Sequence, residues 1–300
     1  MQLAEAMIFS GRRRGSARVS IKYKRSINNL RQYIRTVIIT AMLVIFSAIS
    51  TFAGDTAEVN FIAHRGLRGQ APMNTTSAFK EAISAGCIGI ETDIRLSSDG
   101  YIVCFHDRSI GDTTNGSGNV SSNSFNELKQ VKFTKVDGLN RYPDAKIASF
   151  FEYLQLCRNY NKLAVIDIKF TTNYKELLDK AYYLTKMTGM IDNAVFQCDD
   201  PDFLFYLTSK YPDVRTWYLI TGNIDEADVR IANKIGCEAI NSNRADYDSV
   251  NLGHENGLKV CYYSANTNSE VNRLLACGVD YIMTDGYSMD IFNTENGGEG

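Results

Sequence analysis

Short apolar runs and longer amphipathic stretches alternate along most of this 300-residue chain, from Glu58 to about Asn293. Alternation of this kind is typical of an α/β protein with a parallel sheet. The apolar runs predict strands at residues 59–63, 88–94, 163–168, 194–197, 216–220, 238–241, 259–264 and 281–284. Apolar residues at helical spacing predict helices between them, at residues 74–85, 149–160, 174–187, 201–210, 224–235 and 269–277.

A ninth apolar run, residues 101–106, cannot be another parallel strand. Only the segment 97–100 separates it from Leu96, and a parallel crossover needs a dozen or more residues. We therefore expect this run to fold back on the preceding strand as a hairpin. If Leu96 faces Tyr101, the pairing places Glu91 directly opposite His106.

The remaining strands are the number that closes a (β/α)₈ TIM barrel, and residues 58–293 are close to the usual size of that fold. A doubly wound open sheet is the alternative arrangement. Residues 108–147 are polar and rich in glycine and asparagine, and they are too many for an ordinary connection. We expect them to form a small insertion that covers the barrel mouth. Residues 294–300 are expected to be a disordered tail.

The N-terminal region differs from the rest in charge and hydropathy. Residues 1–36 hold nine Lys and Arg against one acid, and residues 37–53 are mostly apolar. A basic flank, an apolar run and small residues after it predict an export signal cleaved after Ala53. An uncleaved anchor would instead attach the protein to a membrane of ~30 Å through residues 37–53. Either interpretation places the main domain outside the cytoplasm.

Charge and cysteine usage narrow the function classes further. The whole chain has a net charge of −2, so residues 37–300 carry 23 basic and 33 acidic residues. An acidic body of this kind argues against a nucleic-acid partner, which requires a basic surface. The cysteines number seven, and they show no CxxC spacing and lie mostly inside apolar runs. We expect buried free thiols rather than a zinc site or a disulfide framework.

Histidines and carboxylates follow separate apolar runs, where strands are predicted to end. His64 and Arg65 follow the first run, and His106 closes the hairpin run. His254, the third histidine, lacks such a setting and is expected at the surface. Asp107, beside His106, could orient an imidazole, although adjacent residues of a strand point to opposite sides. Because catalytic groups of a barrel gather at the carboxyl ends of its strands, we expect the first two histidines in one site.

Acidic side chains on two further strands predict a metal centre beside these histidines. Glu91 and Asp93 share one face of their strand, and Asp167 and Lys169 have the same spacing on the next. Three carboxylates offer hard oxygen ligands of the kind that suits Mg²⁺ or Ca²⁺. Arg65 and Lys169 would complement a phosphate there. Two histidines flanking such a metal can divide proton transfer in phosphodiester cleavage.

These motifs resemble the glycerophosphodiester phosphodiesterase family. The match runs through Ile62-Ala63-His64-Arg65-Gly66, Ala71-Pro72-Met73-Asn74-Thr75, Ile90-Glu91-Thr92-Asp93, Asp99-Gly100, His106-Asp107 and Thr113-Thr114-Asn115-Gly116-Ser117-Gly118. The resemblance implies a (β/α)₈ barrel that hydrolyses a glycerophosphodiester to sn-glycerol 3-phosphate and an alcohol. It also implies His64 and His106 as an acid–base pair, a divalent cation on Glu91 and Asp93, and phosphate contacts from Arg65 and Lys169.

Three positions depart from the pattern of the family. Met73 stands where the family usually has Glu, and a methionine cannot ligate a hard cation. Asp167 stands where a metal-binding Glu is common, and its shorter side chain should still reach a metal. Tyr263, in Tyr263-Ser264-Ala265-Asn266, replaces a usual Trp and can still pack against a glycerol or head group. Substrate choice is therefore more open than catalysis.

Two alternative functions remain open. A sphingomyelinase D-type or lysophospholipase D-like enzyme, which resembles this family in its barrel, its two histidines and its Asp-x-Lys strand, would act on lipid head groups. The segment 113–118 and the lack of a conspicuous disulfide-rich surface loop favour the glycerophosphodiester phosphodiesterase over this lipid enzyme. A catalytically weak phosphodiester-binding protein is suggested by Met73, but His64, His106, Glu91 and Asp93 are all present.

Overall fold

The computed structural model describes residues 59–292, and within them the strands form a closed barrel. The barrel strands are β1 Phe61–Ala63, β2 Gly89–Leu96, β4 Leu163–Ile168, β5 Ala194–Cys198, β6 Thr216–Ile220, β7 Ala239–Ser242, β8 Lys259–Tyr262 and β9 Tyr281–Thr284. They pair in parallel in the order β1-β9-β8-β7-β6-β5-β4-β2, and a β1–β2 pairing closes the ring. The predicted TIM barrel is confirmed, and the open-sheet alternative is wrong.

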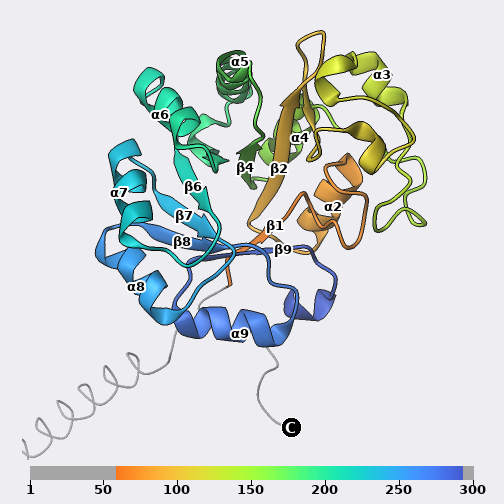
Figure 1. The fold of residues 1–300 in the computed structure, drawn as a ribbon. Helices are drawn as coiled ribbons and strands as arrows, with labels where there is room; N and C mark the ends of the chain where they lie inside the picture. The colour runs from red at the N-terminus through yellow and green to blue at the C-terminus, as the bar shows by residue number, and fades with distance from the viewer. Residues whose placement is uncertain (1–58, 293–300) are drawn as a thin grey trace, which may run out of the picture. The chain divides into compact units, whose positions relative to one another are not determined.

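Helices surround this barrel (Figure 1). They are α2 Thr76–Ser84, α4 Phe150–Asn159, α5 Tyr174–Met187, α6 Pro201–Lys210, α7 Glu226–Ile235, α8 Tyr247–Glu255 and α9 Asn268–Cys277. All six predicted helices are present, with bounds that differ by up to a few residues. Helix α8 was not predicted, because Asp248, Asn251 and Gly253 give its sequence little helical character. A capping box between Asp246 and Ser249 begins it nevertheless.

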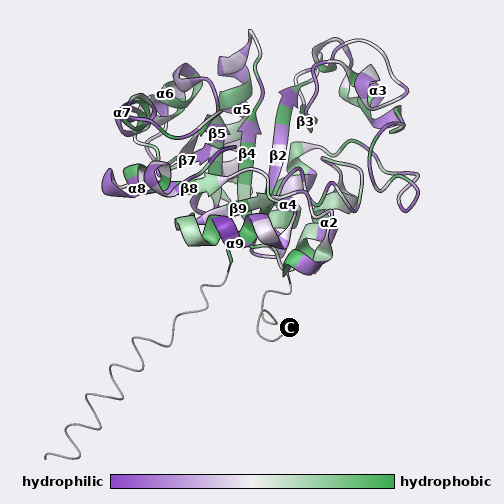
Figure 2. Ribbon diagram, turned by 60° about the horizontal axis from the view of Figure 1, so that its bottom comes forward, coloured by the Kyte–Doolittle hydropathy of each residue, from purple (hydrophilic) through white to green (hydrophobic). Residues whose placement is uncertain are grey.

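Alternation along the strands separates two apolar layers. Ile62, Val165 and Trp217 belong to a cluster inside the barrel, whereas Ile90 and Ile166 pack outward against the helices. Figure 2 shows hydrophobic residues along the strands and mixed hydropathy on the surrounding helices, as expected where each helix has one buried face. Side chains that continue the inward alternation at the carboxyl ends of the strands therefore meet at one end of the barrel.

The hairpin is confirmed, but its predicted register is wrong by one residue. Strand β3, Ile102–Cys104, pairs antiparallel with β2, and Leu96 lies opposite Ile102 rather than Tyr101. The reason is that Ser97 extends the ladder by donating its backbone N–H to Tyr101 O at 2.9 Å. Only three residues are left for the turn, and Gly100 has the positive φ of 81° that ends it. Glu91 is therefore not opposite His106.

The segment after the hairpin builds a small layer of its own. It contains α3 Phe125–Gln130 and the short 3₁₀ turns η1 Ile110–Asp112 and η2 Val120–Ser122. Apolar side chains of this segment pack on the hairpin residues Val103 and Phe105. Two further 3₁₀ turns, η3 Ile191–Asn193 and η4 Met289–Phe292, lie elsewhere in the chain. The packing on Val103 and Phe105 fixes the hairpin and, with it, the residues that follow β3.

All seven cysteines are free, and all except Cys277 are buried, as expected. Between residues 59 and 292, no helix combines the length and apolar character needed to cross a membrane. The predicted basic region 1–36, the export signal or anchor at 37–53 and the tail 294–300 lie outside the described residues.

Candidate active site

Three carboxylates meet at the carboxyl-terminal end of the barrel. Glu91 and Asp93 project from β2, and Asp93 is in register with Asp167 on β4. One oxygen of each residue lies within 4.8 Å of the others. The side chains are almost inaccessible, with exposed fractions of 1%, 1% and 6%. The sequence prediction that these three residues converge is borne out by their positions.

Two basic side chains compensate part of this charge. Lys169 Nζ lies 2.9 Å from Asp93 Oδ1 and 2.9 Å from Asp167 Oδ2. Arg65 Nε lies 3.3 Å from Asp93 Oδ2. Burial alone would raise the pKa of Asp93, but Lys169 and Arg65 outweigh it and hold that pKa well below its ordinary value. Asp93 is therefore the firmly ionised member of the cluster.

Glu91 has the opposite electrostatic setting. Burial raises its pKa well above the ordinary value, and the charges of Asp93 and Asp167 raise it further. Burial likewise raises the pKa of Asp167. Glu91 Oε2 accepts the backbone N–H of Arg65 at 2.7 Å, but its Oε1 is buried with no hydrogen-bond partner. An unpaired buried oxygen and an excess of carboxylates over cations fit a bound divalent cation.

His64 lies beside this cluster, directly after β1, and its Nδ1 is 2.7 Å from Asp285 Oδ1. Ser264 and Asn266 donate hydrogen bonds to the other oxygen of Asp285, at 3.1 Å and 2.8 Å. Burial alone would raise the pKa of Asp285, but mainly the hydrogen bond from His64 lowers it to about 2. Because this carboxylate carries no proton at neutral pH, His64 Nδ1 must donate.

Sequence reasoning missed Asp285. The signal was available, because Asp285 directly follows the apolar strand β9 as His64 directly follows β1. Once the barrel closes, β9 is the neighbour of β1, with Ala63 opposite Thr284. The predicted closed barrel already implied this neighbourhood, so the position of Asp285 could have been found from the sequence.

His106 has an aspartate partner of its own. Its Nδ1 lies 2.7 Å from Asp107 Oδ1. The argument that adjacent residues point to opposite sides does not apply, because β3 ends at Cys104 and the pair lies in a loop. Arg95 fixes this loop by donating Nε and Nη2 hydrogen bonds to His106 O, at 2.9 Å and 2.7 Å. Burial lowers the pKa of His106, and the charge of Asp93 opposes that change.

The loop after β1 supports the cluster through unusual backbone geometry. Gly66 has a φ of 69°, and a Cβ there would lie 2.6 Å from the backbone of Ala78, so only glycine fits. Asn74, with a φ of 57°, donates Nδ2 to Asp93 Oδ2 at 2.7 Å. Its own oxygen accepts the hydroxyl of Thr92 at 2.7 Å. Asn74 thus orients Asp93, a role that sequence reasoning did not assign.

Two positions that depart from the usual pattern also lie near the site. Met73 Sδ is 3.5 Å from Arg65 Nη1, so a neutral side chain stands beside this guanidinium. Tyr263, after β8, is half-buried and donates its hydroxyl to Ile220 O at 3.0 Å. Burial raises its pKa. The hydrogen bond to Ile220, the last residue of β6, holds the Tyr263 hydroxyl against the barrel.

Comparison with known proteins assigns the family. Residues 64–288 match the model of the glycerophosphoryl diester phosphodiesterase family. The chain belongs to this family. It is accordingly a phosphoric diester hydrolase, and the predicted family is confirmed.

Individual known proteins match over most of this domain. The glycerophosphodiester phosphodiesterase of Caldanaerobacter subterraneus subsp. tengcongensis is 26% identical over 75% of this chain and 93% of its own length. The protein YqiK of Bacillus subtilis is 29% identical, over 74% and 93%. A phosphodiesterase of Oleispira antarctica, solved in complex with the product sn-glycerol-3-phosphate, superposes with a TM-score of 0.73 at 25% identity, covering 78% of this chain and 95% of that one.

The pairing of His64 with Asp285 predicts a measurable pKa change in this phosphodiesterase. Burial lowers the pKa of His64, whereas the hydrogen bond and charge of Asp285 raise it. Asp285→Asn removes that charge, so the pKa of His64 should fall further, and kcat should fall by ~10²-fold as the imidazole loses its orientation. NMR titration of the His64 ring measures the pKa. Asp280→Asn, which alters the His254 partner on the surface, is the control, and an unchanged His64 pKa in Asp285→Asn would contradict the account.

Proposed function

We propose that this enzyme hydrolyses glycerophosphodiesters to sn-glycerol 3-phosphate and an alcohol, with His64 and His106 as its acid–base pair. The observation that carries the proposal is the shared arrangement of the two imidazoles. Each has Nδ1 on an aspartate at 2.7 Å, which leaves Nε2 as the ring atom able to exchange a proton. Both histidines follow strands at the end of the barrel where the three carboxylates converge.

The two Nε2 atoms supply the proton transfers that hydrolysis requires. A water attacks phosphorus and gives its proton to one imidazole, and the bond from phosphorus to the alcohol oxygen breaks. The other imidazole, in its protonated form, gives its proton to that departing oxygen. Asp285 and Asp107 stabilise the protonated rings and hold their orientation. The products are a phosphomonoester and a free alcohol. The imidazole that began neutral ends protonated, and the one that began protonated ends neutral.

Glu91, Asp93 and Asp167 would hold a divalent cation, Mg²⁺ or Ca²⁺. The donor set is all oxygen, as these ions prefer, and the unpaired Oε1 of Glu91 is accounted for by a metal ligand role. When bound, such an ion neutralises charge on phosphoryl oxygens. The carboxylates themselves are held in place by Lys169, Arg65 and the Asn74 amide.

Arg65 and Lys169 are assigned to the substrate phosphate. Both carry their charge beside the carboxylate cluster while remaining partly accessible, with exposed side-chain fractions of 13% and 19%. Met73 leaves Arg65 Nη1 without a carboxylate partner from its own loop, so this nitrogen is available to a phosphate oxygen. Tyr263 is assigned to packing against the glycerol or head group, because its hydroxyl is already held by Ile220.

The proposed substrate is a small-molecule or lysolipid phosphodiester outside the cytoplasm. The basic residues 1–36 and the apolar residues 37–53 support export or anchoring. The acidic balance of the remaining chain supports the exclusion of a nucleic-acid partner.

The test is release of sn-glycerol 3-phosphate from glycerophosphocholine in the presence of Mg²⁺ or Ca²⁺, with and without chelator. We expect turnover with metal and its loss on chelation, with restoration when metal is returned. Lysophosphatidylcholine is assayed in parallel, and its preferential cleavage would favour the lipid head-group alternative. Metal-replete protein that cleaves neither phosphodiester would contradict the proposal.

A further inference from the structure

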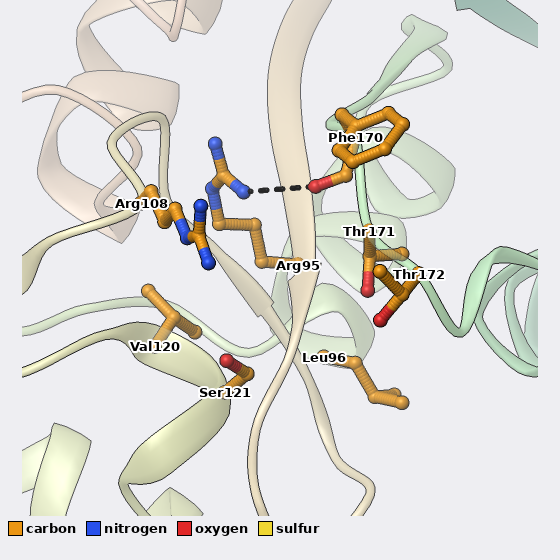
Figure 3. Close-up of a pocket in the computed structure, with 8 residues that line it drawn as sticks. All are labelled: Arg95, Leu96, Arg108, Val120, Ser121, Phe170, Thr171 and Thr172. Atoms are coloured by element: carbon orange, nitrogen blue, oxygen red, sulfur yellow. Dashed lines mark hydrogen bonds between the residues drawn. The ribbon is translucent and has the colours of Figure 1, made fainter.

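A second polar pocket adjoins the active site. It is lined by Arg95, Leu96, Arg108, Val120, Ser121, Phe170, Thr171 and Thr172 (Figure 3). The lining comes from the end of β2, the residues after β3, the turn η2 and the loop between β4 and α5. None of these side chains belongs to the carboxylate cluster or to the acid–base pair.

The pocket is tied to the active site along three segments of chain. Arg95 stands two residues after Asp93, Arg108 two after His106, and Thr171 two after Lys169. Arg95 also bridges two of these segments, because it donates to His106 O and to Phe170 O, the latter at 3.4 Å. The pocket contains no residue of β1 or β9. It therefore lies on the His106 side of the site, away from the strands that carry His64 and Asp285.

The lining has positive charge and no carboxylate of its own. The pocket contains two arginines and no Asp or Glu. In residues 59–292, the arginines that form carboxylate ion pairs are Arg65, Arg68, Arg141, Arg215 and Arg230. Figure 3 shows the guanidinium groups of Arg95 and Arg108 close to one another in this pocket. Two neighbouring guanidinium groups that repel one another favour an anion between them.

Hydrogen-bond donors remain available for such an anion. A guanidinium has about five N–H donors, and Arg95 uses three in its bonds to His106 O and Phe170 O. Figure 3 shows no hydrogen bond from the Arg108 guanidinium to the other residues of the pocket. Ser121, Thr171 and Thr172 add hydroxyl groups. Guanidinium and hydroxyl donors together suit the several oxygens of a phosphate.

We propose that this pocket binds a second phosphate group carried by the alcohol of the substrate. The inference rests on the proposed function and sharpens it, because the glycerol phosphate half is common to all glycerophosphodiesters and only the alcohol varies. The preferred substrates are then glycerophosphodiesters whose alcohol bears a phosphoryl group. The same anion would also contact Arg95, which holds the His106 carbonyl in place.

The kinetic test compares two substrates that differ by one phosphate. These are glycerophosphoglycerol and glycerophosphoglycerol phosphorylated on its second glycerol. We expect wild-type kcat/KM to be about 10-fold higher for the phosphorylated substrate, the scale of one charge-assisted hydrogen bond. Arg108→Gln should remove that preference. Arg158→Gln, which alters an exposed arginine in the last turn of α4, should retain it.

Three kinetic outcomes would overturn the inference. The first is equal kcat/KM for the two substrates in the wild-type enzyme, with the proposed function still standing. The second is an equal fall in kcat/KM for both substrates in Arg108→Gln, which would indicate a general role. The third is a loss of preference in Arg158→Gln as large as in Arg108→Gln.

A binding measurement keeps the inference testable if neither substrate is cleaved, an outcome that would contradict the proposed function. Calorimetric titration of the full chain with inorganic phosphate should show two sites, one at Arg65 and Lys169 and one in the pocket. Arg108→Gln should leave one site. The same stoichiometry in wild-type protein and Arg108→Gln would overturn the pocket assignment.

Discussion

Replacing either His64 or His106 by alanine is expected to lower kcat by ~10²-fold or more, the usual scale for a general acid or base. Each change removes an Nε2 atom that no other side chain described at the site supplies. Neither change removes a metal ligand or a buried charge, so binding of Mg²⁺ and the fold should be retained. Steady-state kinetics with glycerophosphocholine, together with a metal titration of each variant, measures both properties.

His254 provides a matched control for this result. Its Nε2 lies 2.9 Å from Asp280 Oδ2, so it also forms a histidine–aspartate pair, but it is exposed on α8. His254→Ala should therefore leave kcat within about twofold of the wild-type value. A near-normal rate in His64→Ala or His106→Ala would remove that residue from the mechanism, and a large loss in His254→Ala would indicate that the assay reports folding instead.

Glu91→Gln and Asp93→Asn should each lower activity by ~10²-fold or more. In the metal-free protein, however, only Asp93→Asn should lower the free energy of unfolding. Asp93 is held ionised by Lys169 and Arg65. Its neutralisation leaves buried cations without their main partner and should lower the free energy of unfolding by about 3 kcal/mol. Glu91 is destabilised as a carboxylate, and Gln keeps an oxygen for the Arg65 N–H.

The pKa directions give the sign of this difference. Because the pKa of Glu91 is raised on folding, its ionised form lowers stability as pH rises through the folded pKa. Glu91→Gln removes that cost, so at pH 8 the metal-free variant should be at least as stable as the wild type. Urea unfolding in chelator measures the stability, and added Mg²⁺ should stabilise the wild type but not Glu91→Gln. A loss of metal-free stability in Glu91→Gln as large as in Asp93→Asn would contradict the proposed charge distribution.

The barrel was predictable because its strands are short, apolar and separated by helical segments, and eight of them leave no unpaired edge. The elements that escaped prediction depend on single polar contacts. Helix α8 begins at a capping box within a sequence of low helical propensity. The hairpin register shifted because the backbone of Ser97 pairs with Tyr101. A pattern of apolar residues does not report contacts of this kind.

The site was predictable where its residues share a strand and less so where separate loops meet. The spacing of Glu91, Asp93 and Asp167 already placed them on neighbouring strand faces, and the structure brings them together. Asp285 is separated from His64 by 221 positions and reaches it only because the barrel closes. Asp107 bonds His106 because the chain leaves the strand first, so the alternation rule no longer applies.

The central claim is that this site cleaves the bond between phosphorus and the alcohol oxygen by addition of water at phosphorus. Hydrolysis of glycerophosphocholine in H₂¹⁸O, with Mg²⁺ and wild-type enzyme, tests it most directly by mass spectrometry of both products. We predict one ¹⁸O in sn-glycerol 3-phosphate and none in choline, with no product in chelator. Label in choline, or release of phosphocholine and glycerol in place of these products, would contradict the account.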